Sequence, residues 1–167
     1  MVIKQKYGIE EALPGQKENA AESPSIRELV AFEMRERRWA IDARYVTAVR
    51  LKEVVTPLPG SDRHLLGLID ILGSIVPVFS LSELLGLPRS PFDLKTCNLI
   101  VVGENKAELG LQFTGMSEFV SISDKDITYS CPDTFPEPSW VIGVLRNGTI
   151  VLDGGALLSD RSFVVGQ

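Results

Sequence analysis

Three pairs of strand-length segments, each pair joined by turn-forming residues, constrain the fold of this chain most strongly. Apolar residues alternate with polar ones, or form short continuous runs, within residues 30–41, 99–113 and 141–152. Alternation with a period of two places one face of a strand on a core. In the third pair, Asn147 and Gly148 favour a type I′ turn, in which both residues adopt positive φ. Turn signals recur about every ten residues, which favours β-barrels over a doubly wound α/β fold.

Helical signals are few and short. Residues 82–86 predict a short helix that ends at a glycine, and residues 43–49 predict one or two helical turns between strands. A strand, a tight turn, a second strand and a short helix are predicted in residues 67–85 and again in residues 143–158. This weak internal repeat indicates two barrels of similar plan. Pro77 cannot donate a backbone hydrogen bond, so its strand is expected at a sheet edge or beside a bulge.

Composition and charge limit the possible partners. The chain has 167 residues, of which 44% are hydrophobic and 23% charged, a globular composition. The formal net charge of −5 argues against nucleic acid and anionic lipid, since both attract a surplus of Lys and Arg. Residues 1–26 are polar and predict a flexible N-terminal tail, and residues 161–167 predict a C-terminal tail. With neither a secretory signal nor a run of the roughly 20 apolar residues that a membrane helix needs, we expect a cytoplasmic protein.

Reactive groups are scarce. The single histidine, His64, precedes a predicted strand and has no partner motif, so a surface or loop position is favoured over general-base catalysis. Cys97 and Cys131 have neither metal nor redox spacing, and we expect two free thiols. Asp124 and Asp126 flank a lysine and fit a solvated turn better than a cation site. The sequence therefore predicts no catalysis, no metal and no cofactor. It favours a binding module that contacts its partners through exposed apolar surface.

Several segments, in order, resemble a CheW-like domain. The matching segments are residues 39–42, 56–60, 67–73 (GLIDILG), 75–78, 81–86 and 147–158, with Phe32, Val46 and Val49 at matching positions. The resemblance covers residues 27–158, and we expect the domain to span residues 27–160. It implies an all-β domain with short helices, made of two intertwined SH3-like five-stranded β-barrels.

The same resemblance implies a non-catalytic adaptor without a cofactor. Such an adaptor couples chemoreceptors (methyl-accepting chemotaxis proteins) to the regulatory domain of a CheA-type histidine kinase in chemotaxis-like signal transduction. The receptor tip is expected in an apolar groove between the barrels, and the kinase domain against the first barrel. A protein of this kind is recruited to membrane-associated receptor arrays without inserting into the membrane.

Partner-binding roles can be carried over to particular positions. The positions implied for receptor or kinase contact are Val46, Val49, Gly67, Leu72 and Gly73, with Val55 and Leu65 as further positions on a kinase-facing surface. Each position has a structural alternative. The valines fit a core by spacing alone, and the glycines fit a backbone requirement alone.

Two departures from the family pattern leave other functions open. Leu72 stands where the family usually has Arg, so a fork of hydrogen-bond donors is replaced by apolar area. Residues 113–116 (FTGM) lack the Asp that often follows this strand in the family. One alternative is a divergent CheW-like regulatory domain that binds another signalling protein, for example in surface motility. The other alternative is a small ligand-binding barrel, which would have a deep polar pocket around His64 or Asp153.

Overall fold

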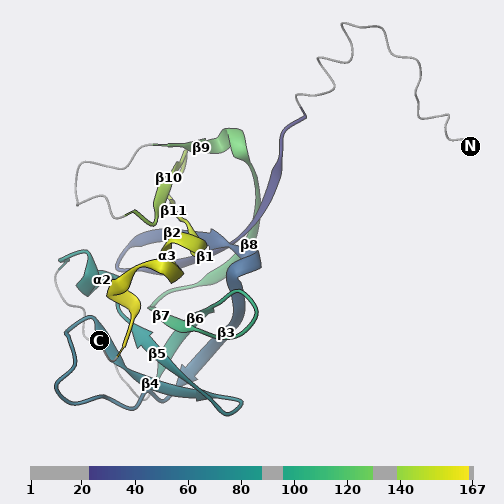
Figure 1. Cartoon of the computed structure of the whole chain (residues 1–167). Helices are drawn as coiled ribbons and strands as arrows, with labels where there is room; N and C mark the ends of the chain where they lie inside the picture. Colours follow the sequence, from purple (N-terminus) through teal and green to yellow (C-terminus); the bar gives the residue numbers. More distant parts are fainter. Residues whose placement is uncertain (1–22, 88–95, 130–138, 166–167) are drawn as a thin grey trace, which may run out of the picture.

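The protein consists of two strongly curved β-sheets with short helices at their margins (Figure 1). The computed structural model describes residues 23–87, 96–129 and 139–165. The six-stranded sheet, in the order β8-β1-β2-β11-β10-β9, contains β1 (Ile26–Met34), β2 (Arg37–Asp42), β8 (Ser117–Ser123), β9 (Ile127–Thr128), β10 (Val141–Leu145) and β11 (Ile150–Leu152). The five-stranded sheet, in the order β3-β6-β7-β5-β4, contains β3 (Val46–Glu53), β4 (Leu65–Ile71), β5 (Ser74–Phe79), β6 (Cys97–Val102) and β7 (Leu109–Phe113). The short helices are η1 (Ala43–Tyr45), α2 (Leu81–Leu84), η2 (Asp124–Asp126), α3 (Gly154–Ser159) and η3 (Arg161–Phe163). The expected all-β class with short helices is confirmed, although one sheet has a sixth strand, β9, of two residues.

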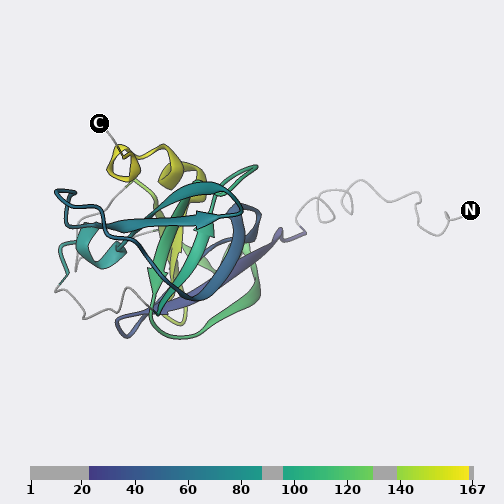
Figure 2. The ribbon, with the colours of Figure 1, turned by 90° about the horizontal axis from the view of Figure 1, so that it is seen from below.

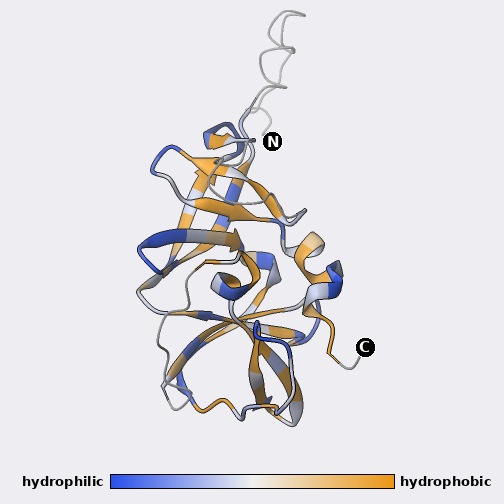
Figure 3. Ribbon diagram, turned by 90° about the vertical axis from the view of Figure 1, so that its left-hand side faces the viewer, coloured by the Kyte–Doolittle hydropathy of each residue, from blue (hydrophilic) through white to orange (hydrophobic). Residues whose placement is uncertain are grey.

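Each sheet encloses a core of its own, and a third core joins the two. The core of the six-stranded barrel is made of Leu29, Ala31, Ala40, Ile127, Leu145 and Val151. The core of the five-stranded barrel is made of Val55, Leu66, Ile69, Ile71, Val76, Val78, Cys97, Leu99 and Val101. The shared core draws on both sheets and includes Phe32, Trp39, Phe79, Leu111 and Trp140. Figure 2 shows the strands curving around the interior, and Figure 3 shows that many of the strand residues are hydrophobic.

Strands β1 and β6 are buried on both faces because they lie between two cores. In β1, Leu29 faces the core of its own barrel, whereas Val30 faces the shared core. In β6, Leu99 and Ile100 divide in the same way. A strand with two apolar environments needs apolar residues at successive positions rather than at alternate ones. The continuous apolar run in residues 99–102 is therefore the signature of this strand between two cores.

The three predicted hairpins are confirmed, but one turn type was predicted wrongly. β1 pairs with β2, β6 with β7, and β10 with β11, all antiparallel. At the third hairpin only Gly148 has positive φ (86°), so Asn147 is not in the left-handed region that a type I′ turn requires. The Gly148 amide donates to Leu145 O, and the Leu145 amide donates to Thr149 O. The loop thus has three residues, Arg146 to Gly148, and ends in a left-handed glycine, the arrangement of a G1-bulge hairpin.

The internal repeat is present in three dimensions. In both copies a hairpin has a bulge at a glycine, Gly67 in β4 and Gly143 in β10. The second strand of each hairpin then pairs in parallel with a strand from another hairpin, β5 with β7 and β11 with β2. A short helix follows in both cases, capped by Ser80 in α2 and by Asp153 in α3. The two barrels therefore share one plan, as the sequence pattern indicated.

The barrels are intertwined because the chain crosses between them twice. After β2 it passes through η1 and enters the five-stranded sheet as β3. After β7 it returns to the six-stranded sheet as β8. Both β3 and β8 are edge strands, and they flank the two sheets on the same side in Figure 1. This exchange brings residues distant in sequence to one surface.

Three smaller expectations have mixed outcomes. Gly86 has φ of 68° after α2, as predicted for a helix-ending glycine. Pro77 lies in β5, which is not an edge strand, but the alternative expectation of a neighbouring bulge is confirmed, because the β4–β5 ladder shifts register between Leu65 and Gly67, opposite Phe79 and Val78. The parallel ladder to β7 begins only at Val78, so no hydrogen bond from a backbone amide of Pro77 is required there. Residues 161–165 do not form a free tail, since Phe163 is buried in the shared core and packs edge-on against Phe79. Most of the predicted N-terminal tail, residues 1–22, lies outside the described residues.

Candidate protein-binding surfaces

The first candidate surface lies along edge strand β3. Val46 and Val49 pair with Val102 and Ile100 of β6, whose side chains belong to the shared core. Cross-strand partners point to the same side of a sheet. Val46 is half-buried against the shared core, whereas Val49 is 36% exposed at its margin. The two predicted residues therefore lie where the junction between the barrels meets solvent.

Edge strand β8 contributes a residue that the sequence did not flag. Phe119 pairs with Val30 of β1, which also belongs to the shared core, yet Phe119 is 71% exposed. Met116, just before β8, is exposed as well. Phe119 in β8 occupies the place that Val49 occupies in β3, since each is paired with a shared-core residue of the neighbouring strand. We name Val46, Val49, Met116 and Phe119 the junction surface.

The second candidate surface is the end of the five-stranded barrel. The β4–β5 hairpin projects there (Figure 1), and its turn consists of Leu72 and Gly73, with φ of 53° and 89°. The Gly73 amide donates to Asp70 Oδ1 at 2.8 Å. Leu72 is 98% exposed. Both predicted residues are thus at a hairpin tip, fully available to a partner.

Apolar side chains continue from this hairpin onto its surroundings. Val54 and Ile75 are both more than 60% exposed. Between them lies a hollow of about 510 Å³, lined by Val54, Thr56, Leu68, Ile69, Asp70 and Ile75. We name Val54, Asp70, Leu72 and Ile75 the hairpin surface. Exposed apolar groups gathered around a concavity are typical of a protein contact.

The remaining predicted positions have structural roles. Val55 is 2% exposed and belongs to the core of the five-stranded barrel, so its side chain is not presented at the surface. Leu65 is half-buried against the shared core. Gly67 is buried at the β4 bulge, and a Cβ there would lie 2.2 Å from Thr56 O. Gly67 is therefore required for close approach of the backbone, and it offers no side chain to a partner.

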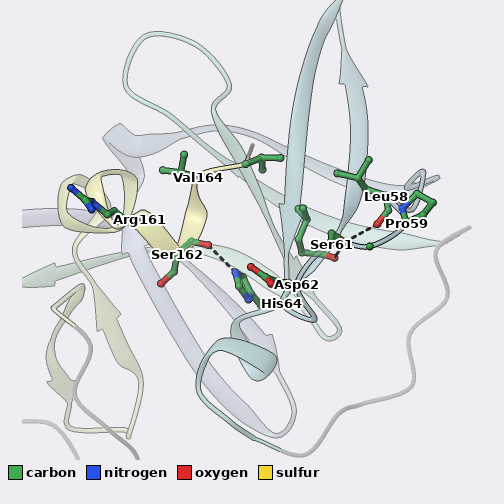
Figure 4. A pocket seen from close by; sticks show the side chains of 11 residues that line it. Leu58, Pro59, Ser61, Asp62, His64, Arg161, Ser162 and Val164 are labelled. Carbon is green, nitrogen blue, oxygen red and sulfur yellow. Dashed lines mark hydrogen bonds between the residues drawn. The ribbon is translucent and has the colours of Figure 1, made fainter. Parts of the chain in front are cut away.

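A separate hollow of about 600 Å³ lies beside His64 (Figure 4). It is formed between the loop of residues 58–65 and the C-terminal segment of residues 161–165. His64 Nε2 lies 2.9 Å from Ser162 O, and its ring stacks on Phe79. These contacts tie the C-terminal segment to the barrel. His64 itself lies in the turn just before β4, as predicted for a surface or loop position, and its Nε2 contact gives it a structural role.

The described part of the chain contains no group of three or more His, Cys, Asp or Glu side chains that could hold a metal ion. Burial raises the pKa of the Cys97 thiol from its ordinary value of 9.0 to about 11, which makes it a poor nucleophile. Cys131 lies outside the described residues. None of the described helices has both the length and the hydropathy needed to cross a membrane.

Comparison with known proteins identifies the family. The family model for the CheW-like domain matches residues 28–162. The chain is 28% identical over 102 residues to the chemotaxis protein CheW of Rhizobium meliloti, and 33% identical over 79 residues to that of Thermotoga maritima. These matches cover 60% and 47% of this chain, and 64% and 50% of the relatives' own lengths.

Among solved structures, the scaffolding protein TtCheW of Thermoanaerobacter tengcongensis has the same fold. It superimposes with a TM-score of 0.66 at 22% sequence identity, over 78% of this chain and 86% of that protein. The structural match therefore agrees with the double-barrel architecture, and the family model extends over both barrels. On this evidence the chain belongs to the CheW-like domain family.

Proposed function

We propose that this protein is a non-catalytic adaptor that couples chemoreceptors to a CheA-type histidine kinase in chemotaxis-like signalling. Membership of the CheW-like family supports the proposal, as do the names of the relatives, which are chemotaxis proteins. The single observation that carries it is the presence of two separate exposed apolar surfaces, the junction surface and the hairpin surface, on one small double barrel. An adaptor needs two such surfaces to hold two partners at once.

The junction surface is the proposed site for the receptor tip. A chemoreceptor tip is a helical hairpin, and an amphipathic helix lays its apolar stripe onto apolar side chains of a partner. Val49 on edge strand β3 and Phe119 on edge strand β8 provide such side chains. Exposed aromatic side chains contribute large contact areas at low conformational cost.

The hairpin surface is the proposed site for the kinase regulatory domain. Leu72, Val54 and Ile75 provide an apolar centre, and the ionisable Asp70 lies at its margin. Interfaces of moderate affinity commonly combine an apolar centre with a polar rim. In an array of many receptors and kinases, modest individual affinities are sufficient because multivalency adds to them. The protein would then act on the cytoplasmic side of the membrane that holds the receptors.

Co-sedimentation tests this proposal directly. Membranes that contain chemoreceptors are incubated with the purified protein, with the CheA-type kinase, or with both, and then pelleted. We expect the protein to pellet with the receptor membranes and to increase the amount of kinase in the pellet several-fold. Absence of the protein from every receptor pellet would contradict the proposal.

A second candidate function is that of a divergent CheW-like regulator for another signalling system. Leu72 favours it, because the usual Arg of the family is absent at the most exposed position of the hairpin surface. Capture of a kinase from a surface-motility system, with no binding to chemotaxis receptor membranes, would favour this candidate. A ligand-binding barrel is less well supported, since apolar side chains occupy the interiors of both barrels in the described residues. The hollow beside His64 lies between a loop and the C-terminal segment, and is not a barrel interior.

A further inference from the structure

Leu72 adopts a conformation that its own side chain disfavours. Its φ of 53° is in the left-handed region, where an L-residue other than Asn, Asp or Gly is strained. At 98% exposure it makes almost no contact within the chain that could offset this cost. Strain retained without internal compensation points to a function.

Comparison within the molecule makes Leu72 more unusual. Four of the described non-glycine residues have positive φ, and the three others, Arg35, Glu36 and Lys52, are charged. The turn between β1 and β2 also has two residues with positive φ, Arg35 and Glu36, and both are charged. The fold itself therefore does not require an apolar side chain at such a turn.

The surroundings of Leu72 define the chemistry of its partner. Val54, Leu68, Ile69 and Ile75 give the adjacent hollow an apolar lining. Asp70 is the only ionisable side chain that lines this hollow, and among the described residues no cation lies within ion-pair distance of it. A complementary surface is thus apolar opposite Leu72 and basic opposite Asp70.

We infer that Leu72 and Asp70 determine which kinase regulatory domain this adaptor accepts. The accepted domain has an uncharged apolar recess that receives Leu72 and a Lys or Arg side chain that faces the Asp70 carboxylate. A domain that presents a charged group in place of the recess is rejected, because Leu72 offers it neither a hydrogen-bond donor nor a charge. This inference rests on the proposed function and specifies its kinase partner.

Two substitutions in the full chain test the inference with the purified regulatory domain of a CheA-type kinase. Leu72→Asn removes the apolar side chain and suits the left-handed turn, so affinity should fall roughly tenfold or more while Tm stays equal or rises. Asp70→Asn retains the oxygen that accepts from Gly73, and should lower affinity and flatten its dependence on salt. Ile26→Asn is the matched control, because Ile26 is an exposed apolar residue on the other sheet and should leave binding unchanged.

The outcomes separate the inference from the proposed function. Leu72→Asn that binds within twofold of the wild type overturns the inference while the adaptor function stands. Leu72→Asn with a clearly lowered Tm overturns it too, since the leucine would then support the fold. Failure of the wild-type protein to bind the kinase domain would contradict the proposed function itself, and the inference with it.

Discussion

Substitution of Gly67 by alanine should destabilise the protein by about 3 kcal/mol. A Cβ at this position would lie 2.2 Å from Thr56 O and 2.8 Å from Val55 Cγ1, well inside van der Waals contact. Thr56 is held there by two hydrogen bonds with Leu68, Thr56 N to Leu68 O at 2.9 Å and Leu68 N to Thr56 O at 2.8 Å.

The magnitude follows from what must move. The bridge between Thr56 and Leu68 has to open, which costs roughly 0.5–1.5 kcal/mol for each of its two hydrogen bonds. Overpacking against buried Val55 adds about 1 kcal/mol or more. For a chain of this length, a loss of about 3 kcal/mol lowers Tm by roughly 6–12 °C.

Thermal unfolding followed by circular dichroism measures this effect, with two glycines as references. At Gly143, the equivalent glycine of the other barrel, a Cβ would lie 2.2 Å from Thr128 O, so Gly143→Ala should also lower Tm. Its effect should not exceed that of Gly67→Ala, because Gly67 in addition has a φ of 152°. A Cβ added at Gly110 would lie no closer than 3.5 Å to any other atom, so Gly110→Ala should lower Tm much less. If Gly67→Ala kept the wild-type Tm but lost partner binding, the backbone explanation of Gly67 would be refuted.

Three further predictions concern stability and reactivity. Phe163→Ala should lower the free energy of unfolding by about 3–5 kcal/mol in urea titration, because Phe163 is buried in the shared core; a loss below about 1 kcal/mol would indicate a loose C-terminal segment. Gly148→Ala should lower the free energy of unfolding by about 1–2 kcal/mol in the same titration, because φ is 86° at this position. A Cβ there would meet nothing within 4 Å, so the loss would come from the backbone conformation alone, and an unchanged stability would contradict the left-handed turn. Because burial raises the pKa of Cys97 to about 11, the unfolded chain loses its thiol proton before the folded chain does. Stability should then fall as pH rises from about 9 to 11, and a Cys97→Ala variant should lack this component of the decline.

The hairpins and the repeated plan could be predicted because both depend on residues that are close together in the sequence. Alternating and continuous apolar runs fix which residues face a core, and glycines mark the bulges and turns. The loop at Arg146 to Gly148 shows the limit of such signals. Asn147-Gly148 favours a two-residue turn, but register across β10 and β11 adds Arg146 to the loop, and no local motif reports that register.

The candidate surfaces were predicted less completely, since exposure depends on packing between distant segments. Val54 and Val55 are adjacent valines, and only the fold decides that Val54 is exposed and Val55 buried. Phe119 looks like an ordinary core residue of an alternating strand. Phe119 is exposed because β8, the strand by which the chain returns to the six-stranded sheet, is an edge strand that the shared core does not cover at this position.

The central claim is that exposed apolar side chains on a solid double barrel, in two separate places, hold two different partners. Paired pull-downs of Phe119→Ser and Leu72→Asn against receptor membranes and against the kinase regulatory domain test it most directly. We expect Phe119→Ser to lose receptor binding and keep the kinase, and Leu72→Asn to show the reverse, with both variants folded by circular dichroism. Wild-type binding of both partners by both folded variants would contradict the claim.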